Sequence, residues 1–194
     1  MNHWFGYSLL IVGNLAGIAI RVPHDSRNRK IRVVDDRKGK LEIFLLLFMA
    51  AGVLLLPLLA IATPLLAFAD YTLSPWSLMA GACCLALNLW LFHRAHADLS
   101  TNWSPTLQLR DGHSLITSGI YTRIRHPMYS AIYLLVLAQA FLLANWIAGP
   151  AALVAFTLMY AFRMRPEEQM MVDKFGDEYR SYAARTKRLI PGLW

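Results

Sequence analysis

Two clusters of polar residues stand directly beside long apolar runs. The first, from Arg125 to Tyr129, reads RHPMY and closes a polar segment that begins at His93. The second, from Arg163 to Glu168, reads RMRPEE and follows the next apolar run. Histidine, tyrosine, arginine and glutamate side chains gathered at the edge of apolar segments are costly to arrange without a use. We therefore interpret the two clusters as parts of one functional site.

Taken singly, each cluster has a simpler interpretation. Arg125 and His126 could anchor the end of a membrane span by extending toward the lipid headgroups. Pro166 suits the first turn of a helix, where Glu167 and Glu168 would complement the helix dipole. The convergence of both clusters on one place favours the functional interpretation.

A metal site has weaker support. His93 and His96 stand three residues apart with Asp98 nearby, but a third well-spaced ligand is not obvious. The two cysteines, Cys83 and Cys84, are neighbours in an apolar run, which suits buried thiols better than a disulfide or a metal ligand pair. We expect no bound metal.

The elements that position the site are hydrophobic helices. The chain is 57% hydrophobic and 16% charged, with a mean hydropathy of +0.40, whereas soluble domains carry about 25% charged residues. A helix needs about 20 apolar residues to cross a bilayer. Three runs before the polar segment approach or exceed that length: Trp4 to Ile20, Leu41 to Ala69 and Trp76 to Phe92. Pro57 and Pro64 should kink or shorten the second of them.

A fourth apolar run, from Tyr129 to Phe162, contains no charge and is too long for one crossing. Its 34 residues would span about 51 Å as a straight helix. Asn145, Gly149 and Pro150 offer a break in its middle. We predict two short helices joined as a hairpin, which gives five spans and brings His126 close to Glu167.

Positive charge indicates the orientation. All 19 lysines and arginines lie in three segments, Arg21 to Lys40, His93 to Met128 and Arg163 to Trp194. Five spans place these segments on one side, which the positive-inside rule makes cytoplasmic. Although the net charge is +7, we expect basic residues beside spans to meet membrane lipids and not nucleic acid.

These observations predict an all-α fold, an integral membrane bundle of five transmembrane helices. Its cytosolic pocket would be built from residues 93–128 and the C-terminal helices. We expect a single domain over residues 1–194, in which residues 1–92 supply three spans and residues 93–194 supply the hairpin and the site.

The motifs also resemble a known family. The run from Gly119 to Tyr129 (GIYTRIRHPMY), the pair Glu167-Glu168 and the run from Phe175 to Tyr182 (FGDEYRSY) are similar to the isoprenylcysteine carboxyl methyltransferases. Related membrane phospholipid and small-thiol methyltransferases share the pattern. The resemblance covers about Asn102 to Pro191, and the first two spans match only as hydrophobic helices.

The resemblance implies S-adenosylmethionine as methyl donor in a cytosolic pocket. Arg163 matches a substrate-contacting position, which makes it our candidate catalytic residue, and Gln108 is a candidate for one further polar contact. The positions that the resemblance assigns to the cofactor are His113, Ser114, Leu115, Ile116, Tyr121, His126, Pro127, Met128, Tyr129 and Glu167.

The implied function is methyl transfer to a lipid-borne acceptor, with the carboxylate of a prenylated cysteine first in order. A carboxylate is already an anion at neutral pH and needs no base, and Arg163 could hold it in a bidentate pair. A phospholipid amine or small thiol is the alternative, and an amine needs a base such as His126 or Glu168. A membrane scaffold or small transporter is the non-enzymatic alternative. It would place polar residues along a path, for which Asn14, Asn88 and Gln139 are the main candidates.

Overall fold

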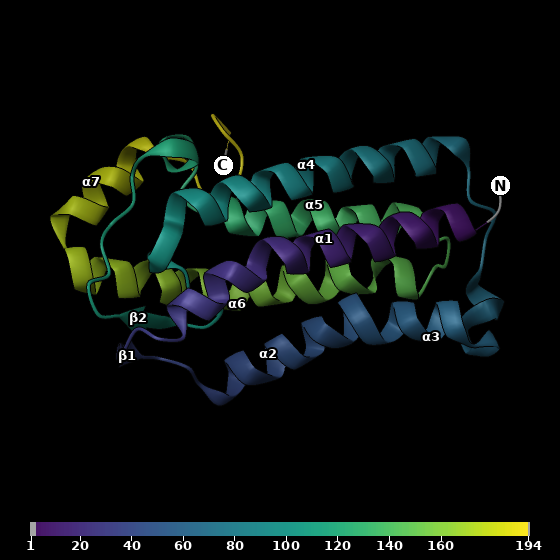
Figure 1. The fold of residues 1–194 in the computed structure, drawn as a ribbon, viewed down its shortest axis with the longest axis horizontal. Coiled ribbons are helices and arrows are strands. Elements are labelled where there is room, and N and C mark those ends of the chain that lie inside the picture. The colour runs from purple at the N-terminus through teal and green to yellow at the C-terminus, as the bar shows by residue number, and fades with distance from the viewer. Residues whose placement is uncertain (1–2, 194) are drawn as a thin grey trace.

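The computed structural model describes residues 3–193 and is mostly helical, with long helices lying side by side along its longest axis (Figure 1). The main helices are α1 (Trp4–Asn28), α2 (Lys40–Ala50), α3 (Leu56–Ala62), α4 (Pro75–Leu99), α5 (Pro127–Leu142), α6 (Ala148–Phe175) and α7 (Asp177–Arg185). A π-helix (Ala51–Leu55) joins α2 to α3, and short 3-10 helices cover Pro64–Ala69, Ser100–Asn102 and Gly119–Thr122.

Three of the described helical stretches are long and apolar enough to cross a membrane, namely Trp4–Asn28, Lys40–Ala62 and Pro75–Asn102. α5 is apolar but shorter. α6 has an apolar first half, whereas its second half carries charges from Arg163 onward. The structure therefore has three clear spans and a helical hairpin, and not five clear spans as we predicted.

The hairpin differs from its prediction in one helix. α5 is short, but α6 runs without a break for 28 residues, and Pro166 lies inside it and not in the first turn of a new helix. Pro166 cannot donate a hydrogen bond to the fourth residue before it, which weakens a helix but does not end it when contacts hold both sides. One such contact is the ion pair between Arg163 and Glu167, which stand four residues apart across the proline.

Proline shapes the second span as predicted. Pro57 lies at the start of α3, directly after the π-helix. Because its ring displaces the preceding turn and it lacks an N–H, wider i to i+5 bonding there accommodates it. Pro64 then begins a 3-10 helix after Thr63, and that helix leads to the turn before α4.

The fold is mostly helical, as predicted, but it also contains two short strands that the prediction of an all-α fold did not include. β1 (Val33–Asp36) and β2 (Gln108–Arg110) form a two-stranded antiparallel sheet, with Asp36 opposite Gln108. The sheet ties the segment after α1 to the segment after α4. Two polar connections that are far apart in the sequence are therefore held at the same end of the bundle.

The opposite end of the bundle is held by Asn145, in the turn between α5 and α6. Its Nδ2 donates to Asp70 Oδ1 and to the Leu66 carbonyl, each at 2.7 Å. Its Oδ1 accepts from the N–H groups of Ile147 and Ala148 and so caps the start of α6. The α5–α6 turn thus lies beside the α3–α4 connection.

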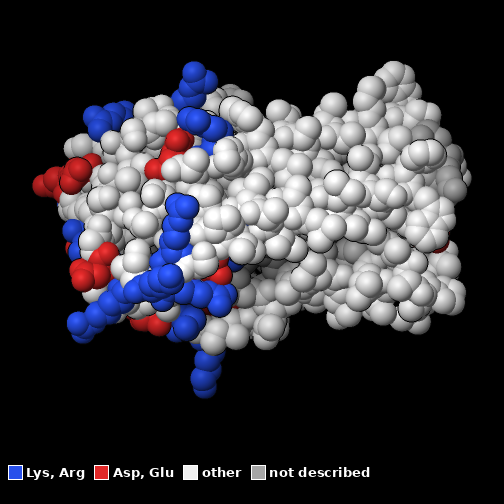
Figure 2. All heavy atoms as spheres, viewed as in Figure 1, with Lys and Arg blue, Asp and Glu red and all other residues white. Residues whose placement is uncertain are grey.

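Close packing in the middle of the bundle depends on small residues. A Cβ on Gly52 would lie 3.1 Å from the Cα of Ala152 on α6, so the helix pair could not keep this spacing with a larger residue. Gln139 of α5 donates to the carbonyls of Gly52 and Ala148, each at 2.9 Å. Figure 2 shows the lysines and arginines gathered at one end of the molecule, the end that β1, β2 and α7 occupy in Figure 1.

Candidate active site

A cavity of about 400 Å³ lies at the charged end of the bundle. It is lined by the segments 102–109, 113–116 and 125–129, by one face of α6 and by side chains of α1 and α2. Its volume falls within the range of about 300–1,000 Å³ that is usual for small-molecule and cofactor sites.

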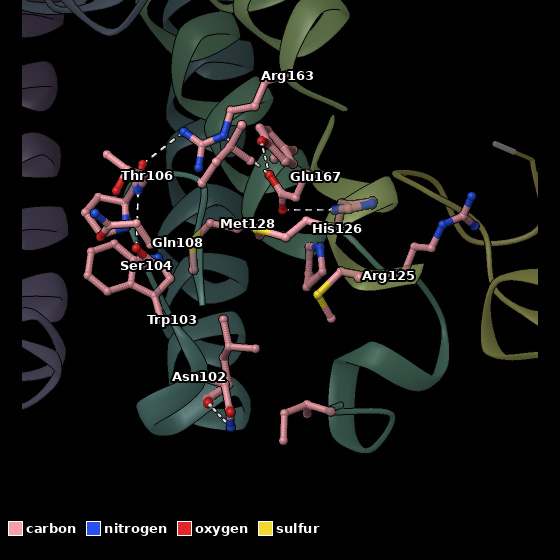
Figure 3. A pocket seen from close by; sticks show the side chains of 18 of the residues that line it. Asn102, Trp103, Ser104, Thr106, Gln108, Arg125, His126, Met128, Arg163 and Glu167 are labelled. Carbon is pink, nitrogen blue, oxygen red and sulfur yellow. Dashed lines mark hydrogen bonds and ion pairs between the residues drawn. The ribbon is translucent and has the colours of Figure 1, made fainter. Parts of the chain in front are cut away.

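Every predicted cofactor position lines this cavity. These positions are residues 113–116, Tyr121, residues 126–129 and Glu167. Arg163 and Gln108 line it as well. Figure 3 shows Glu167 pointing toward His126, and Arg163 reaching the loop beside Thr106. The structure brings the residues together, and their roles in binding a cofactor stay predictions.

His126 is positioned by the start of α5 and by a backbone hydrogen bond to the C-terminal segment. It precedes Pro127, the first residue of α5, where a proline costs no helical hydrogen bond. Its backbone N–H donates to the carbonyl of Arg188 at 3.0 Å, and Arg125 N–H donates to Lys187 at 2.8 Å. The C-terminal segment after α7 therefore fixes the start of α5.

Tyr121 sits on the 3-10 helix Gly119–Thr122, which Asp98 holds at its start. The Asp98 carboxylate accepts from the N–H of Ile120 at 2.8 Å. Gly119 has φ +60°, and a Cβ there would clash with the Asp98 carboxylate, so this close approach requires glycine.

The segment 113–116 is anchored by Asn102. Its Oδ1 accepts from the backbone N–H of Ser114 at 2.8 Å and from its hydroxyl at 3.4 Å. Burial, reinforced by the nearby charge of Lys174, lowers the pKa of His113 to about 4. His113 is therefore neutral at physiological pH and offers one donor and one acceptor.

Glu167 is the acidic group of the cavity. Its carboxylate accepts a hydrogen bond from the Tyr129 hydroxyl at 2.6 Å, and it lies 3.7 Å from His126 Nδ1 and 3.4 Å from Arg163 Nε. Burial opposes its ionisation, but the contacts with the His126 ring and the charge of Arg163 outweigh burial and lower the pKa of Glu167 to about 2. The cavity therefore keeps a fixed negative charge at neutral pH.

Glu168 faces away into a network of cations. It accepts from Arg125 Nε at 2.6 Å, from Arg188 at 2.7 Å, and lies 3.3 Å from His126 Nε2. Burial opposes its ionisation, but hydrogen bonds with His126, Arg188 and Arg125 hold its pKa well below its usual range. Burial alone would lower the pKa of His126, but the adjacent carboxylates of Glu167 and Glu168 outweigh burial and raise that pKa. Glu168 is therefore ionised and a weak base at neutral pH.

Sequence reasoning missed Glu42, which contacts the site from α2. Its side chain is 7% exposed and lies 3.3 Å from Arg163. The one signal was its position as the only charge in the run from Leu41 to Ala69, since a charge within a span is functional by default. Trp103 was missed too; it lines the cavity and carries the Arg21 guanidinium 4.8 Å above its ring.

The remaining polar candidates have local structural partners. His96 is buried, its Nδ1 lies 2.9 Å from the Phe92 carbonyl, and its ring packs against Trp103. Asn88 donates to the Ala131 carbonyl at 2.7 Å, and Asn14 donates to a carbonyl of its own helix. Within residues 3–193, no three histidine, cysteine, aspartate or glutamate side chains gather as metal ligands do.

A bundle of apolar helices with a cavity at its charged end defines a membrane protein whose cavity has the size of a small-molecule site. Residues 76–178 match the phospholipid methyltransferase family, and the chain belongs to this family. It is an integral multi-pass membrane protein that resembles isoprenylcysteine O-methyltransferases.

Curated relatives support the same family. The chain is 32% identical over 79 residues to protein-S-isoprenylcysteine O-methyltransferase of Schizosaccharomyces pombe, covering 41% of this chain and 34% of the relative. It is 35% identical over 83 residues to the Homo sapiens enzyme of the same name, covering 42% and 28%. With the Dictyostelium discoideum enzyme it is 27% identical over 128 residues, covering 63% and 52%. The chain thus spans about half the length of these relatives or less.

A solved structure shares the fold. The eukaryotic intramembrane Ras methyltransferase, isoprenylcysteine carboxyl methyltransferase, superposes with a TM-score of 0.55 at 22% identity. The superposition covers 82% of this chain and 55% of that one.

Proposed function

We propose that the protein transfers a methyl group from S-adenosylmethionine to a lipid-borne acceptor, most simply the carboxylate of a prenylated cysteine. One observation carries the proposal. In a chain of this family, all the positions that the resemblance assigns to the cofactor and the substrate line a single cavity.

The residues present fit the donor. S-adenosylmethionine would supply an electrophilic methyl group on a cationic sulfonium. The ionised carboxylate of Glu167 and the ring of Tyr129 offer a cation an opposite charge and an aromatic face. His113 and the backbone of 113–116 offer hydrogen-bond partners to a polar ligand. The work of these residues is binding, orientation and exclusion of water.

The cavity also suits a lipophilic acceptor. Leu46 and Met49 of α2, Ile132 of α5 and Met159 of α6 line it and lie on helices with apolar surfaces. Arg163 projects into the same space, with a planar guanidinium that matches a carboxylate. We infer that the apolar chain of the acceptor lies against these helices, while Arg163 holds its anionic end.

A phospholipid amine is the less favoured acceptor. An amine must lose a proton before or during attack, so it requires a base. The lowered pKa of Glu168 makes that carboxylate a poor base at neutral pH. Both ring nitrogens of His126 already face carboxylates, at 3.7 Å from Glu167 and 3.3 Å from Glu168. A carboxylate acceptor requires no base.

We also propose five crossings with the cavity in the cytoplasm. α5 and the first half of α6 lie antiparallel beside the clear spans, and their turn is tied to the α3–α4 connection through Asn145 and Asp70. All lysines and arginines then fall on one side.

Methyl transfer by purified protein tests the proposal. The protein in detergent is given radiolabelled S-adenosylmethionine with N-acetyl-S-farnesylcysteine, phosphatidylethanolamine or a small thiol. We expect incorporation into the farnesylcysteine. Arg163→Lys keeps the charge but loses the planar fork, so catalytic efficiency toward this acceptor should fall about 10- to 100-fold.

Arg165→Lys is the matched control, because Arg165 is exposed on the same helix and does not line the cavity. It should behave as wild type. Methyl incorporation into phosphatidylethanolamine alone would show that the acceptor is a phospholipid amine and not a prenylcysteine carboxylate. Binding of S-adenosylmethionine without transfer to any acceptor, or no binding, would refute the proposed function in favour of a scaffold or transporter.

A further inference from the structure

Glu42 links α2 to the cavity wall at two points. Its Oε1 accepts the backbone N–H of Leu107 at 3.0 Å and lies 3.3 Å from Arg163 Nη1. The same Nη1 donates to the carbonyl of Pro105 at 2.9 Å. Glu42, Arg163 and the loop 105–107 therefore form one closed group, although α2 lies outside the segment 76–178 that matches the family.

Arg163 is shared between two carboxylates. It lies 3.3 Å from Glu42 and 3.4 Å from Glu167, both longer than the about 2.7–2.9 Å of a strong charge-assisted hydrogen bond. Its short bond goes to the neutral carbonyl of Pro105. The guanidinium is thus kept in place by two loose charge contacts, an arrangement that leaves it able to turn its fork toward an incoming anion.

The face of α2 that carries Glu42 continues into the cavity. Leu46 and Met49 follow Glu42 by four and seven residues, so all three lie on one side of the helix. Leu46 and Met49 line the cavity directly. One helix face therefore offers a carboxylate that contacts Arg163, followed by apolar surface.

A purely structural role explains this arrangement poorly. Among the described residues, Glu42 Oε2 is buried and has no hydrogen-bond partner. Leaving one carboxylate oxygen buried and unsatisfied is unfavourable, and a structural contact to Leu107 alone would not require a charge there.

We propose that Glu42 is a positioning residue for the acceptor. This inference rests on the proposed function, in which Glu167 serves the donor and Arg163 the acceptor. When the donor engages Glu167, Glu42 keeps the Arg163 guanidinium at the cavity wall, directed toward the acceptor carboxylate. The α2 face of Glu42, Leu46 and Met49 is then the wall that selects the acceptor.

Glu42→Gln tests this role, because glutamine still accepts from Leu107 but has no charge for Arg163. The intact protein in detergent is titrated with N-acetyl-S-farnesylcysteine in the presence of S-adenosylhomocysteine, and S-adenosylmethionine affinity is measured separately. We expect acceptor affinity to fall about tenfold while donor affinity changes less than about twofold.

Two further variants complete the experiment. Asp173 is exposed, does not line the cavity, and pairs with Arg37 at a distance of 2.6 Å. Asp173→Asn removes this carboxylate and should leave both affinities unchanged. Glu42→Asp keeps the charge on a shorter side chain and should restore part of the acceptor affinity. If Glu42→Gln fails to fold, the test is whether Glu42→Asp weakens acceptor binding while donor affinity stays unchanged. In the double variant, Glu42→Gln should add little to Arg163→Lys, because both changes disable the same guanidinium.

The outcomes separate the two hypotheses. Methyl transfer by wild type with unchanged acceptor affinity in Glu42→Gln overturns the inference alone. Equal losses of donor and acceptor affinity, or fully additive losses in the double variant, also overturn it, since both indicate a general structural role. Acceptor binding to wild type without methyl transfer overturns the proposed function but not the role of Glu42. Absence of acceptor binding overturns both.

Discussion

Adjacent residues on one helix serve different purposes in this site. Glu167 lines the cavity and accepts a hydrogen bond from the Tyr129 hydroxyl. Glu168 does not line the cavity and forms ion pairs with Arg125 and Arg188. Successive helical residues point about 100° apart, so a neighbouring pair can face a ligand and a structural network at once. His126 lies between the two carboxylates and couples them.

The role of Glu167 can be measured in donor binding. Glu167→Gln keeps the shape and removes the charge, and we expect S-adenosylmethionine affinity to fall about 10- to 150-fold, which corresponds to a lost charged hydrogen bond of about 1.5–3 kcal/mol. Calorimetry on purified protein gives the affinity. Glu178→Gln, on the exposed face of α7, serves as control and should bind as wild type. Unchanged affinity in both Glu167→Gln and His126→Ala would remove these residues from the donor site.

Glu168 should appear in the pH dependence of stability. Its pKa and that of Glu167 are lower in the folded state, so their contributions are present above about pH 4.5 and are lost as the pH falls toward about 2. Conversely, the raised pKa of His126 contributes stability below about pH 6.5 that is lost as the pH rises through its folded value.

Replacing Glu168 should therefore make thermal stability depend less on pH in the acid range. Thermal unfolding in detergent between pH 7 and pH 3 should show a smaller loss of Tm below pH 4.5 for Glu168→Gln than for wild type. At pH 7 the variant should lose about 1.5–3 kcal/mol, with the lower end favoured because Arg188 is partly exposed. Asp177→Asn, which removes an exposed pair with Arg180, should follow the wild-type curve. If Tm falls below pH 4.5 by the same amount in Glu168→Gln and in wild type, the ion pairs of Glu168 do not determine the acid sensitivity.

At the scale of elements, apolar length predicted more than local signals did. The spans at α1, α2–α3 and α4 follow from apolar runs, and the π-helix before Pro57 follows from proline geometry. The end of α6 could not be found in the same way, because Pro166 is tolerated where an ion pair bridges it. Local helix rules do not register such compensation.

Pairings between distant segments were also invisible in the sequence. β1 and β2 are too short to show an alternating pattern, and they pair across 72 residues between Asp36 and Gln108. Arg188 reaches Glu168 only because the segment after α7 turns back along residues 124–126. Every position that the motifs assigned to the site lines the cavity, whereas the contacts of Glu42 and Arg188 became visible only in the three-dimensional structure.

At the scale of the whole molecule, charge and polar contacts agree on one arrangement. The charged end holds the cavity, and the opposite end is apolar apart from groups such as Asp70, which Asn145 binds at 2.7 Å. α5 spans only 16 residues, about 24 Å at 1.5 Å per residue, which is shorter than a hydrocarbon core of about 30 Å. The contact between Asn145 and Asp70 nevertheless places the hairpin turn on the same side as the α3–α4 connection.

Cysteine labelling distinguishes five crossings from three. In a background without Cys83 and Cys84, single cysteines replace Trp146 in the hairpin turn, Thr72 in the α3–α4 connection or Glu178 on α7, all exposed positions. Five crossings place Trp146 and Thr72 outside and Glu178 in the cytoplasm, because all lysines and arginines then lie inside. A membrane-impermeant thiol reagent added to intact cells should therefore label Trp146→Cys and Thr72→Cys, and should label Glu178→Cys only after lysis. Labelling of Thr72→Cys but not Trp146→Cys in intact cells would mean that the α5–α6 hairpin does not cross the bilayer, and labelling of Glu178→Cys alone would reverse the orientation.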